Sequence, residues 1–361
     1  MSDIRPFRGI RPRPDIAPQI AAPPYDVVDF EEGAAYVADK PDSFMRVEKS
    51  EIELDASLHV HDEKIFENGA KNLQRLLADR KMLKDPTPCY YLYRQKMGDH
   101  VQTGVVAGAS IDEYEAGAIK IHEFTREVKE KERTMHVDIV GANTGPVFLT
   151  YQASAEIDAF VTEFCGHNPD VDFVSEDGVG HTLWVVSAPP DVGALQEMFG
   201  RVPALYVADG HHRSAAACNV RKTRQAANEA HTGQEAYNYF LTVIFPHDQM
   251  MIMEYNRVVK DLNGMTALEV LDKVGGRFVV EETTEASPPA AKQFGMFIGG
   301  KWYRLTAREG TYPADDPVAS LDVAILQHSL LAPILGIGDP RTDERVQFVG
   351  GIRGSVELEK R

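Results

Sequence analysis

The amino-acid sequence predicts a mixed α+β fold built around a central mixed sheet, and three observations lead to this expectation. Apolar residues recur at helical spacing in some segments and alternate or run continuously in others. Clusters of Pro, Gly, Asn and Asp separate these segments. Hydrophobic residues make up 43% and charged residues 26% of the chain, as in globular proteins. For 361 residues, at roughly 150 per domain, we expect three parts: residues 1–85, 86–264 and 265–361.

The first part opens with a proline-rich segment. Its prolines fix φ and remove amide donors, so we expect residues 4–29 to be extended and wrapped over the rest of the protein, without regular structure. Apolar side chains spread through this segment give it surface to bury: Phe7, Ile10, Ile16, Ile20, Tyr25, Val27 and Val28. Helical spacing then predicts a helix within residues 55–82, which ends before Pro86.

The central part supplies the predicted sheet. β-rich runs at residues 90–93 and 101–111 predict one hairpin, and the runs at 240–245 and 250–255 predict a second. Short strands and helices are expected between the two hairpins, at residues 147–151, 155–165, 171–175, 181–186 and 194–199. The last part predicts strands followed by a helix from Asp322 that ends before Pro333; the strands are at residues 277–280, 293–298 and 302–305.

The net charge and the cysteine content exclude several classes of function. The chain has 38 Lys and Arg against 55 Asp and Glu, and its net charge of −17 repels nucleic acid and anionic membranes. Cys89, Cys165 and Cys218 lie far apart, so neither a disulfide framework nor a thiolate metal site is predicted. The first residues lack an apolar signal core, and no run approaches about 18 apolar residues. We expect a cytoplasmic protein that binds neither nucleic acid nor a membrane.

The clearest junction in the chain is an apolar strand that ends at Asp209 and is followed by an Ala-rich helix. The first amides of a helix are unpaired and the helix dipole is positive there, so a phosphate can bind at this place. Gly210 permits close backbone approach, and His211, His212 and Arg213 can donate to phosphoryl oxygens. Asp209 can bind Mg²⁺ or accept a hydroxyl proton.

A purely structural interpretation of this junction is also open. Asp209 would cap the helix, Gly210 would make the turn and both histidines would face solvent. That interpretation accounts for Asp209 and Gly210 but leaves two histidines and Arg213 unexplained.

A second motif, His122-Glu123-x-Thr125, lies where a loop meets a predicted helix. An acid and an imidazole at such a boundary can converge on a pocket, but the motif lacks the second histidine of the zinc-binding H-E-x-x-H pattern. We interpret the charged run beyond Glu127 as an ordinary solvated helix, with the ion pairs Glu127–Lys131 and Lys129–Glu132.

Two further groups are candidates for substrate contact. The rigid Pro23-Pro24-Tyr25-Asp26 segment would hold a hydroxyl and a carboxylate in fixed positions, although Tyr25 could instead simply pack on the core. Asn256 and Arg257 end a predicted strand and could reach the same end of the sheet, or form a salt bridge there.

Together these motifs resemble the bacterial family known as domain of unknown function 1015. The motifs are P-P-Y-D, H-E-x-T with Lys129 and Arg133 downstream, D-G-H-H-R, and Gly350-Gly351. The resemblance runs from about Ile4 to Gly351, and Glu132 stands where the family tends to have Asp.

That family is in turn similar to the ParB and sulfiredoxin superfamily, in which a comparable turn at a helix N-terminus holds nucleotide phosphates. The resemblance therefore implies a ParB/sulfiredoxin-like core with a proline-rich N-terminal wrap and a small C-terminal α/β lobe. Because that superfamily includes free L-serine kinases, it also implies nucleotide-dependent phosphorylation of a small alcohol. Free L-serine is the expected acceptor, and ATP or ADP with Mg²⁺ are the expected cofactors.

Two other functions are open. One is a non-catalytic, nucleotide-binding regulatory module like ParB, against which the charge of −17 argues where DNA is the partner. The other is a sulfiredoxin-like reductase, but His211 and His212 stand where its cysteine would be, and Cys218 lies inside the helix.

The kinase hypothesis assigns roles to individual residues. Glu123 is the expected base and His122 assists it, while Asp209 holds Mg²⁺ or orients the acceptor. The donor phosphates are expected at Gly210, His211, His212 and Arg213. Substrate contacts are expected from Tyr25, Asp26, Thr125, Asn256 and Arg257.

Overall fold

The computed structural model describes residues 2–123, 125–340, 342–351 and 354–360, with the backbone alone at 355–357. The chain forms two compact units, Met1–Met251 and Ile252–Arg361. The first unit therefore contains the whole of segment 1–85 and most of segment 86–264, which the sequence analysis separates. It also contains the sheet that positions most of the candidate residues.

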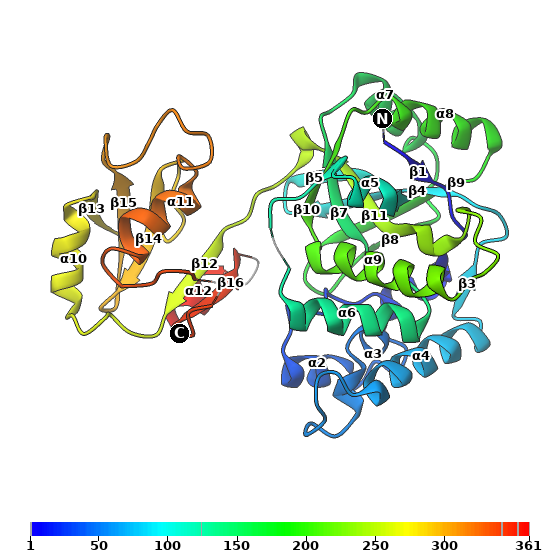
Figure 1. The fold of residues 1–361 in the computed structure, drawn as a ribbon, viewed down its shortest axis with the longest axis horizontal. Coiled ribbons are helices and arrows are strands. Elements are labelled where there is room, and N and C mark those ends of the chain that lie inside the picture. Colours follow the sequence, from blue (N-terminus) through cyan, green and yellow to red (C-terminus); the bar gives the residue numbers. More distant parts are fainter. Residues whose placement is uncertain (1, 124, 341, 352–353, 361) are drawn as a thin grey trace. The chain divides into compact units, whose positions relative to one another are not determined.

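A large mixed sheet organises the first unit, as the sequence predicts (Figure 1). Its strands follow the order β6-β10-β7-β11-β5-β4-β9-β8, and β1 pairs with β5. Two neighbouring pairs, β6 with β10 and β7 with β11, are parallel, whereas the others are antiparallel. The strands of the unit are β1 (Ile4–Arg5), β2 (Ile10–Pro12), β3 (Met82–Lys84), β4 (Tyr90–Met97), β5 (His100–Ser110), β6 (Ile119–Lys120), β7 (Val147–Tyr151), β8 (Val171–Val174), β9 (Gly180–Val186), β10 (Leu205–Asp209) and β11 (Tyr239–Pro246).

Helices pack on this sheet in two groups. The helix α9 packs against α6, α6 against α4, and α4 against α3, whereas α7 and α8 pack together elsewhere on the sheet (Figure 1). The helices are α1 (Ala17–Ile20), α2 (Phe30–Val37), α3 (Met45–Glu48), α4 (Glu63–Ala78), α5 (Ile111–Glu115), α6 (Glu127–Val140), α7 (Ala155–Phe164), α8 (Pro189–Gly200) and α9 (His211–Ala226). Short 3₁₀ turns η1 (Pro14–Ile16), η2 (Ser50–Glu53), η3 (Ala236–Asn238) and η4 (His247–Gln249) join them.

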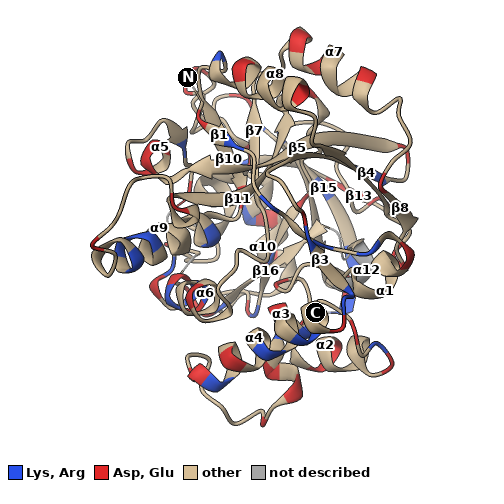
Figure 2. Ribbon diagram, turned by 90° about the vertical axis from the view of Figure 1, so that its right-hand side faces the viewer, with Lys and Arg blue, Asp and Glu red and all other residues tan. Residues whose placement is uncertain are grey.

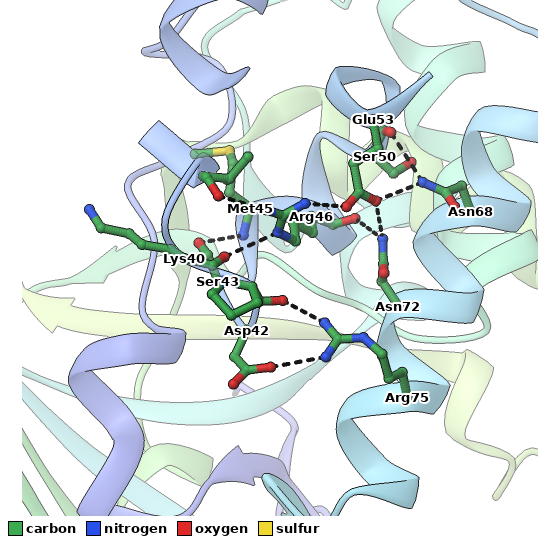
Figure 3. A network of polar contacts seen from close by, with 12 residues as sticks. Lys40, Asp42, Ser43, Met45, Arg46, Ser50, Glu53, Asn68, Asn72 and Arg75 are labelled. Carbon is green, nitrogen blue, oxygen red and sulfur yellow. Dashed lines mark hydrogen bonds and ion pairs between the residues drawn. The ribbon is translucent and has the colours of Figure 1, made fainter. Parts of the chain in front are cut away.

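A polar network fixes the short helix α3 against α4 (Figure 3). The amides of Asn68 and Asn72 donate to the Glu53 carboxylate at 2.9 and 2.6 Å, and Arg46 pairs with the same carboxylate. Burial opposes the charge of Glu53, but these bonds outweigh burial and lower its pKa. The network therefore fixes the position of the chain next to Glu48, the last residue of α3.

The second unit has its own core and sheets. The strands β13 (Phe278–Thr283), β15 (Lys301–Ala307) and β14 (Gln293–Ile298) form an antiparallel sheet, and β12 (Tyr255–Val259) pairs with β16 (Val346–Gly350). Its helices are α10 (Ala267–Gly275), α11 (Asp322–Leu326), the π-helical turn η5 (Gln327–Leu331) and α12 (Gly354–Lys360). Its apolar cluster, which includes Val274, Phe278 and Leu305, contains residues of this unit alone.

Two sequence expectations are wrong. The second hairpin does not form, because β11 pairs with β5 and β7, and residues 250–254 carry no strand. Residues 4–29 are not free of regular structure, since β1 and β2 join sheets and α1 buries Ala17 and Ile20. Single prolines at the ends of these short elements do not interrupt them.

Candidate functional site

The strand–turn–helix junction is confirmed, and it depends on the backbone of Gly210. Gly210 has φ +94°, a left-handed value that a side chain rarely tolerates. A Cβ at this position would lie 3.3 Å from Cα of Val147 and 3.4 Å from the Arg213 guanidinium. Glycine therefore lets the chain turn tightly from β10 into α9, whose first amides are left open.

Arg213 is the third residue of α9 and is held in place by two acceptors. It pairs with Asp209 at 2.9 Å and donates to the carbonyl oxygen of Pro146. Its side chain is 20% exposed, whereas that of Asp209 is 71% exposed. The guanidinium is thus fixed at the mouth of the junction. Figure 2 shows basic residues on α9, which carries Arg213 in its first turn and Arg221, Lys222 and Arg224 near its C-terminal end.

His211 is the most buried titratable side chain of the junction, with 5% of its side chain exposed. Its Nδ1 lies 3.7 Å from Oε2 of Glu123, and its ring meets that of His122 edge-on with centroids 4.5 Å apart. Its other nitrogen, Nε2, is buried without a hydrogen-bond partner among the described residues. The structural interpretation in which both histidines face solvent is therefore wrong for His211.

The structure thus brings the H-E-x-T and D-G-H-H-R motifs together. Burial lowers the pKa of His211, and the neighbouring His122 adds to this effect, while Glu123 opposes it. Burial also lowers the pKa of His212, whose Nδ1 has no hydrogen-bond partner within the described chain. Two imidazoles, each with a buried nitrogen that lacks a hydrogen-bond partner among the described residues, therefore lie at the start of α9.

Thr125 has a structural partner. Its hydroxyl donates to Glu130 at 2.5 Å, and Asn219 of α9 donates to the same carboxylate at 2.8 Å. These two hydrogen bonds lower the pKa of Glu130. Thr125 thereby anchors the loop that carries His122 and Glu123 to the α6–α9 contact.

Behind the junction lies a charged group around Arg133, whose burial the sequence pattern does not predict. Arg133 is 7% exposed and pairs with Glu48 at 3.3 Å and with Glu132 at 2.8 Å. Its guanidinium also lies 4.0 Å from the centre of the Tyr25 ring. The charged run beyond Glu127 is therefore not uniformly solvated, although its predicted Lys129–Glu132 pair forms at 3.3 Å.

A small cavity connects this group with the turn from β10 into α9. Its volume is about 20 Å³, room for one water molecule, and Glu48, Arg133, His136 and Arg213 line it. Oε1 of Glu48 and Nε of Arg133 are buried without a partner in the part of the chain that is described. The spacing of Arg133, His136 and Val140, which all point to one side of α6, is the signal that could have predicted their burial.

Tyr25 lies in this group, whereas Asn256 and Arg257 belong to the second unit and not, as the sequence had suggested, to the central sheet. Burial raises the pKa of Tyr25 to about 12, despite the opposing charges of Arg133 and Arg213. Asp26 beside it is exposed. Asn256 and Arg257 belong to β12 of the second unit, where the Arg257 guanidinium lies against the rings of Tyr255 and Phe348.

The side chains and amides at the junction suit an anion better than a metal ion held by protein ligands alone. Among the described residues, no three His, Cys, Asp or Glu side chains are grouped so that they could hold a metal ion. Arg213, two imidazoles and the open amides of α9 instead supply donors for phosphoryl oxygens. Glu123 and Asp209, both largely exposed, supply carboxylates at its rim.

Comparison with known proteins places the chain in a family. No curated protein and no solved structure matches the sequence. Within the described residues, no helix is long and apolar enough to cross a membrane. The model of the family described as "Protein of unknown function (DUF1015)" matches residues 4–324, which include all three motifs of the junction and its surroundings. Because this match covers most of its length, the chain belongs to the DUF1015 family.

Proposed function

We propose that this chain is a nucleotide-dependent kinase that phosphorylates the hydroxyl of a small molecule, with free L-serine as the expected acceptor. The observation that carries the proposal is the pair of buried, unpartnered imidazole nitrogens beside Arg213 at the open end of α9. Such donors lack a counterpart until an anion with several oxygens binds. The likeness of the core to the ParB and sulfiredoxin superfamily is part of this proposal.

The phosphates of ATP or ADP bind to the amides that open α9, to Arg213 and to the two imidazoles. Mg²⁺ is usually held by one or two carboxylates together with phosphate oxygens, and the exposed carboxylate of Asp209 fits as one such ligand. When bound, the ion would neutralise phosphate charge. The proposed wall of the substrate pocket includes Tyr25, which Arg133 holds in position.

Glu123 acts as the base in the proposed reaction. Its carboxylate accepts the proton of the acceptor hydroxyl, whose oxygen forms a bond to the terminal phosphorus of the nucleotide. The bond from that phosphorus to the bridging oxygen breaks, which leaves ADP from ATP or AMP from ADP. Glu123 then releases the proton to solvent, which it reaches because 60% of its side chain is exposed. The imidazoles of His122 and His211 lie beside it and orient it.

Nucleotide binding is the first test. ATP or ADP should raise the melting temperature of the protein with Mg²⁺ present, because a ligand of the folded state stabilises it. Arg213→Ala should weaken this binding by about 1.5 to 3 kcal/mol, the worth of a charged hydrogen bond. Arg224→Ala, at the far end of α9, is the matched control and should bind like the wild type. Equal nucleotide affinity in a folded Arg213→Ala variant places the phosphates elsewhere.

Turnover is the second test. Incubation with ATP or ADP and L-serine, threonine or other small alcohols should yield a phosphate ester, detected by phosphorus NMR. Glu123→Gln should lower turnover by about 10²- to 10⁴-fold and leave nucleotide binding nearly intact, whereas Glu127→Gln should have no effect. Full activity in Glu123→Gln overturns the assignment of the base. Nucleotide binding without any product favours the regulatory module instead.

A further inference from the structure

A second cavity, of about 430 Å³, lies in the first unit between the sheet and α7. This volume is within the range of small-molecule sites. None of its lining residues belongs to the candidate site at α9. It is therefore a separate place at which a ligand could bind.

Strand register explains which residues form the floor of the cavity. Arg94 of β4 lies opposite Thr103 of β5, and Val105 of β5 lies opposite Ile244 of β11. Tyr151 of β7 lies opposite Pro246 of β11. Alternate residues of a strand share one face of the sheet, so these pairs form one continuous surface.

The helix α7 and the residue after it form the roof. The lining residues Asp158, Val161, Thr162 and Cys165 follow one another at intervals of three, one and three positions, which places them on one face of the helix. The carboxylate of Asp158 therefore comes from the roof and the guanidinium of Arg94 from the floor.

The guanidinium of Arg94, on the floor of the cavity, is held in place but has no counterion in the described part of the chain. Nε of Arg94 donates to the Thr103 hydroxyl at 3.1 Å, and its guanidinium lies 4.9 Å from the centre of the Trp184 ring. Asp158 is partly buried, and its pKa is raised by burial and by the charge of Asp248. Across the described ranges, neither Arg94 nor Asp158 forms an ion pair. A cation and an anion thus line one cavity, and neither has an ion-pair partner among the described residues.

The rest of the lining has polar groups, from Thr103, Tyr151, Thr162 and Gln249, and an apolar part. Val101, Val105, Val161, Ile244 and Pro246 contribute hydrocarbon surface. Val101 is 42% exposed although it belongs to a strand of the central sheet. An apolar group bound in the cavity would cover this surface and gain from its burial.

We infer that this cavity binds a zwitterionic amino acid with an apolar side chain. Arg94 binds its carboxylate, Asp158 binds its ammonium group, and the side chain packs on the valines and Ile244. A ligand with a single charge would satisfy only one of the two ionic groups and leave the other without a partner. The site is independent of the proposed kinase function, because it shares no residue with α9.

Matched ligands test the inference on the intact protein. L-Leucine, 4-methylpentanoate and 3-methylbutylamine share a hydrocarbon body but carry both charges, the carboxylate alone and the ammonium alone. Leucine should bind at least ~10-fold more tightly than either analogue, because each lost charged hydrogen bond costs about that factor or more. Calorimetric titration measures all three. In 4-aminobutyrate and 6-aminohexanoate the same two charges are further apart than in leucine, and both should bind more weakly than leucine.

Two variants and two controls assign the charges. Arg94→Gln should abolish the preference for leucine over 3-methylbutylamine, and Asp158→Asn the preference over 4-methylpentanoate. Lys96→Gln on the same strand and Glu163→Gln on the same helix lie outside the cavity lining and should keep both preferences. Comparing ligands within one variant removes any general loss of stability from the result.

Cys165 gives a second measurement that does not depend on affinity. It lines the cavity and is partly exposed, whereas Cys89 and Cys218 are buried. Bound leucine should slow alkylation of Cys165 by iodoacetamide at least several-fold, as measured by mass spectrometry. No protection by any zwitterion of the series, or equal binding of leucine and both single-charge analogues, overturns the inference.

Discussion

At the scale of single residues, the candidate site depends on Gly210 more than on any side chain. Its left-handed backbone directs α9 so that Arg213 can reach both Asp209 and the carbonyl of Pro146. A side chain at residue 210 would press on Val147 and on the guanidinium that is expected to hold phosphate. Backbone conformation and charge placement are therefore coupled at one position.

Gly210→Ala should lower the free energy of unfolding by at least about 1 to 2 kcal/mol, the cost of a left-handed conformation for an L-residue. Gly193→Ala is the matched control, because Gly193 lies within α8 with open space around its Cα. That change should raise stability by roughly 0.5 to 1 kcal/mol. Urea denaturation measures both, and a Gly210→Ala midpoint equal to that of the wild type contradicts the geometry described for this turn.

At the scale of secondary-structure elements, α6 is the link between the N-terminal helices and α9. One side of it carries Thr134, whose hydroxyl lies 3.4 Å from the amide nitrogen of Asn219 on α9, while His136 contacts the carbonyl of Val47 at 3.1 Å. Since that carbonyl can only accept, Nε2 of His136 is the donor. The helix thus buries ionisable side chains between two layers, and we expect the stability of the protein to depend on pH.

Burial lowers the pKa of His136 below its ordinary value of 6.5, with Arg133 adding to this effect and Glu48 opposing it. Below pH 6.5 the unfolded chain therefore binds the proton first, and stability falls as pH falls until the folded pKa is reached. His136→Gln should remove up to about 1.4 kcal/mol per pH unit of this dependence. Urea denaturation between pH 7.5 and 5 tests it, with the exposed His167→Gln as control. Parallel curves for His136→Gln and the wild type contradict the prediction.

At the scale of the whole molecule, the chain consists of two units with separate cores. The junction residues from His122 to Arg213 all belong to the first unit, and the 430 Å³ cavity does too. Ile252, the first residue of the second unit, is 94% exposed. The first unit should therefore fold and bind nucleotide by itself.

A fragment of residues 1–251 should unfold in one cooperative transition and show the same rise in melting temperature with nucleotide as the full chain. Limited proteolysis of the full chain should cut first near the exposed Ile252, since such sites admit a protease. The fragment lacks the second unit, so loss of serine phosphorylation with retained nucleotide binding would show that phosphorylation requires residues 252–361. A fragment that folds but does not bind nucleotide shows that the first unit is not sufficient for nucleotide binding.

The sequence by itself determined those features of this protein that are built from consecutive residues, such as turns, hairpins and helix starts. The hairpin of β4 and β5 and the turn from β10 through Gly210 into α9 follow from apolar runs, turn residues and an Ala-rich helix. The grouping of His211, His212 and Arg213 at that helix end is equally local. These features could be predicted because neighbouring residues fix turn geometry and helix starts.

Only the tertiary structure decided which charged residues are buried and which strands pair. The residues next to Arg133 in the sequence are charged, as in a solvated helix. Its partner Glu48, however, lies 85 positions earlier in the chain, and Tyr25 lies earlier still. β11 pairs with β5 and β7 rather than with the segment that follows it. The physical reason is the same in both cases: burial and strand pairing depend on contacts between distant segments, and a periodic pattern within one segment does not specify its partner.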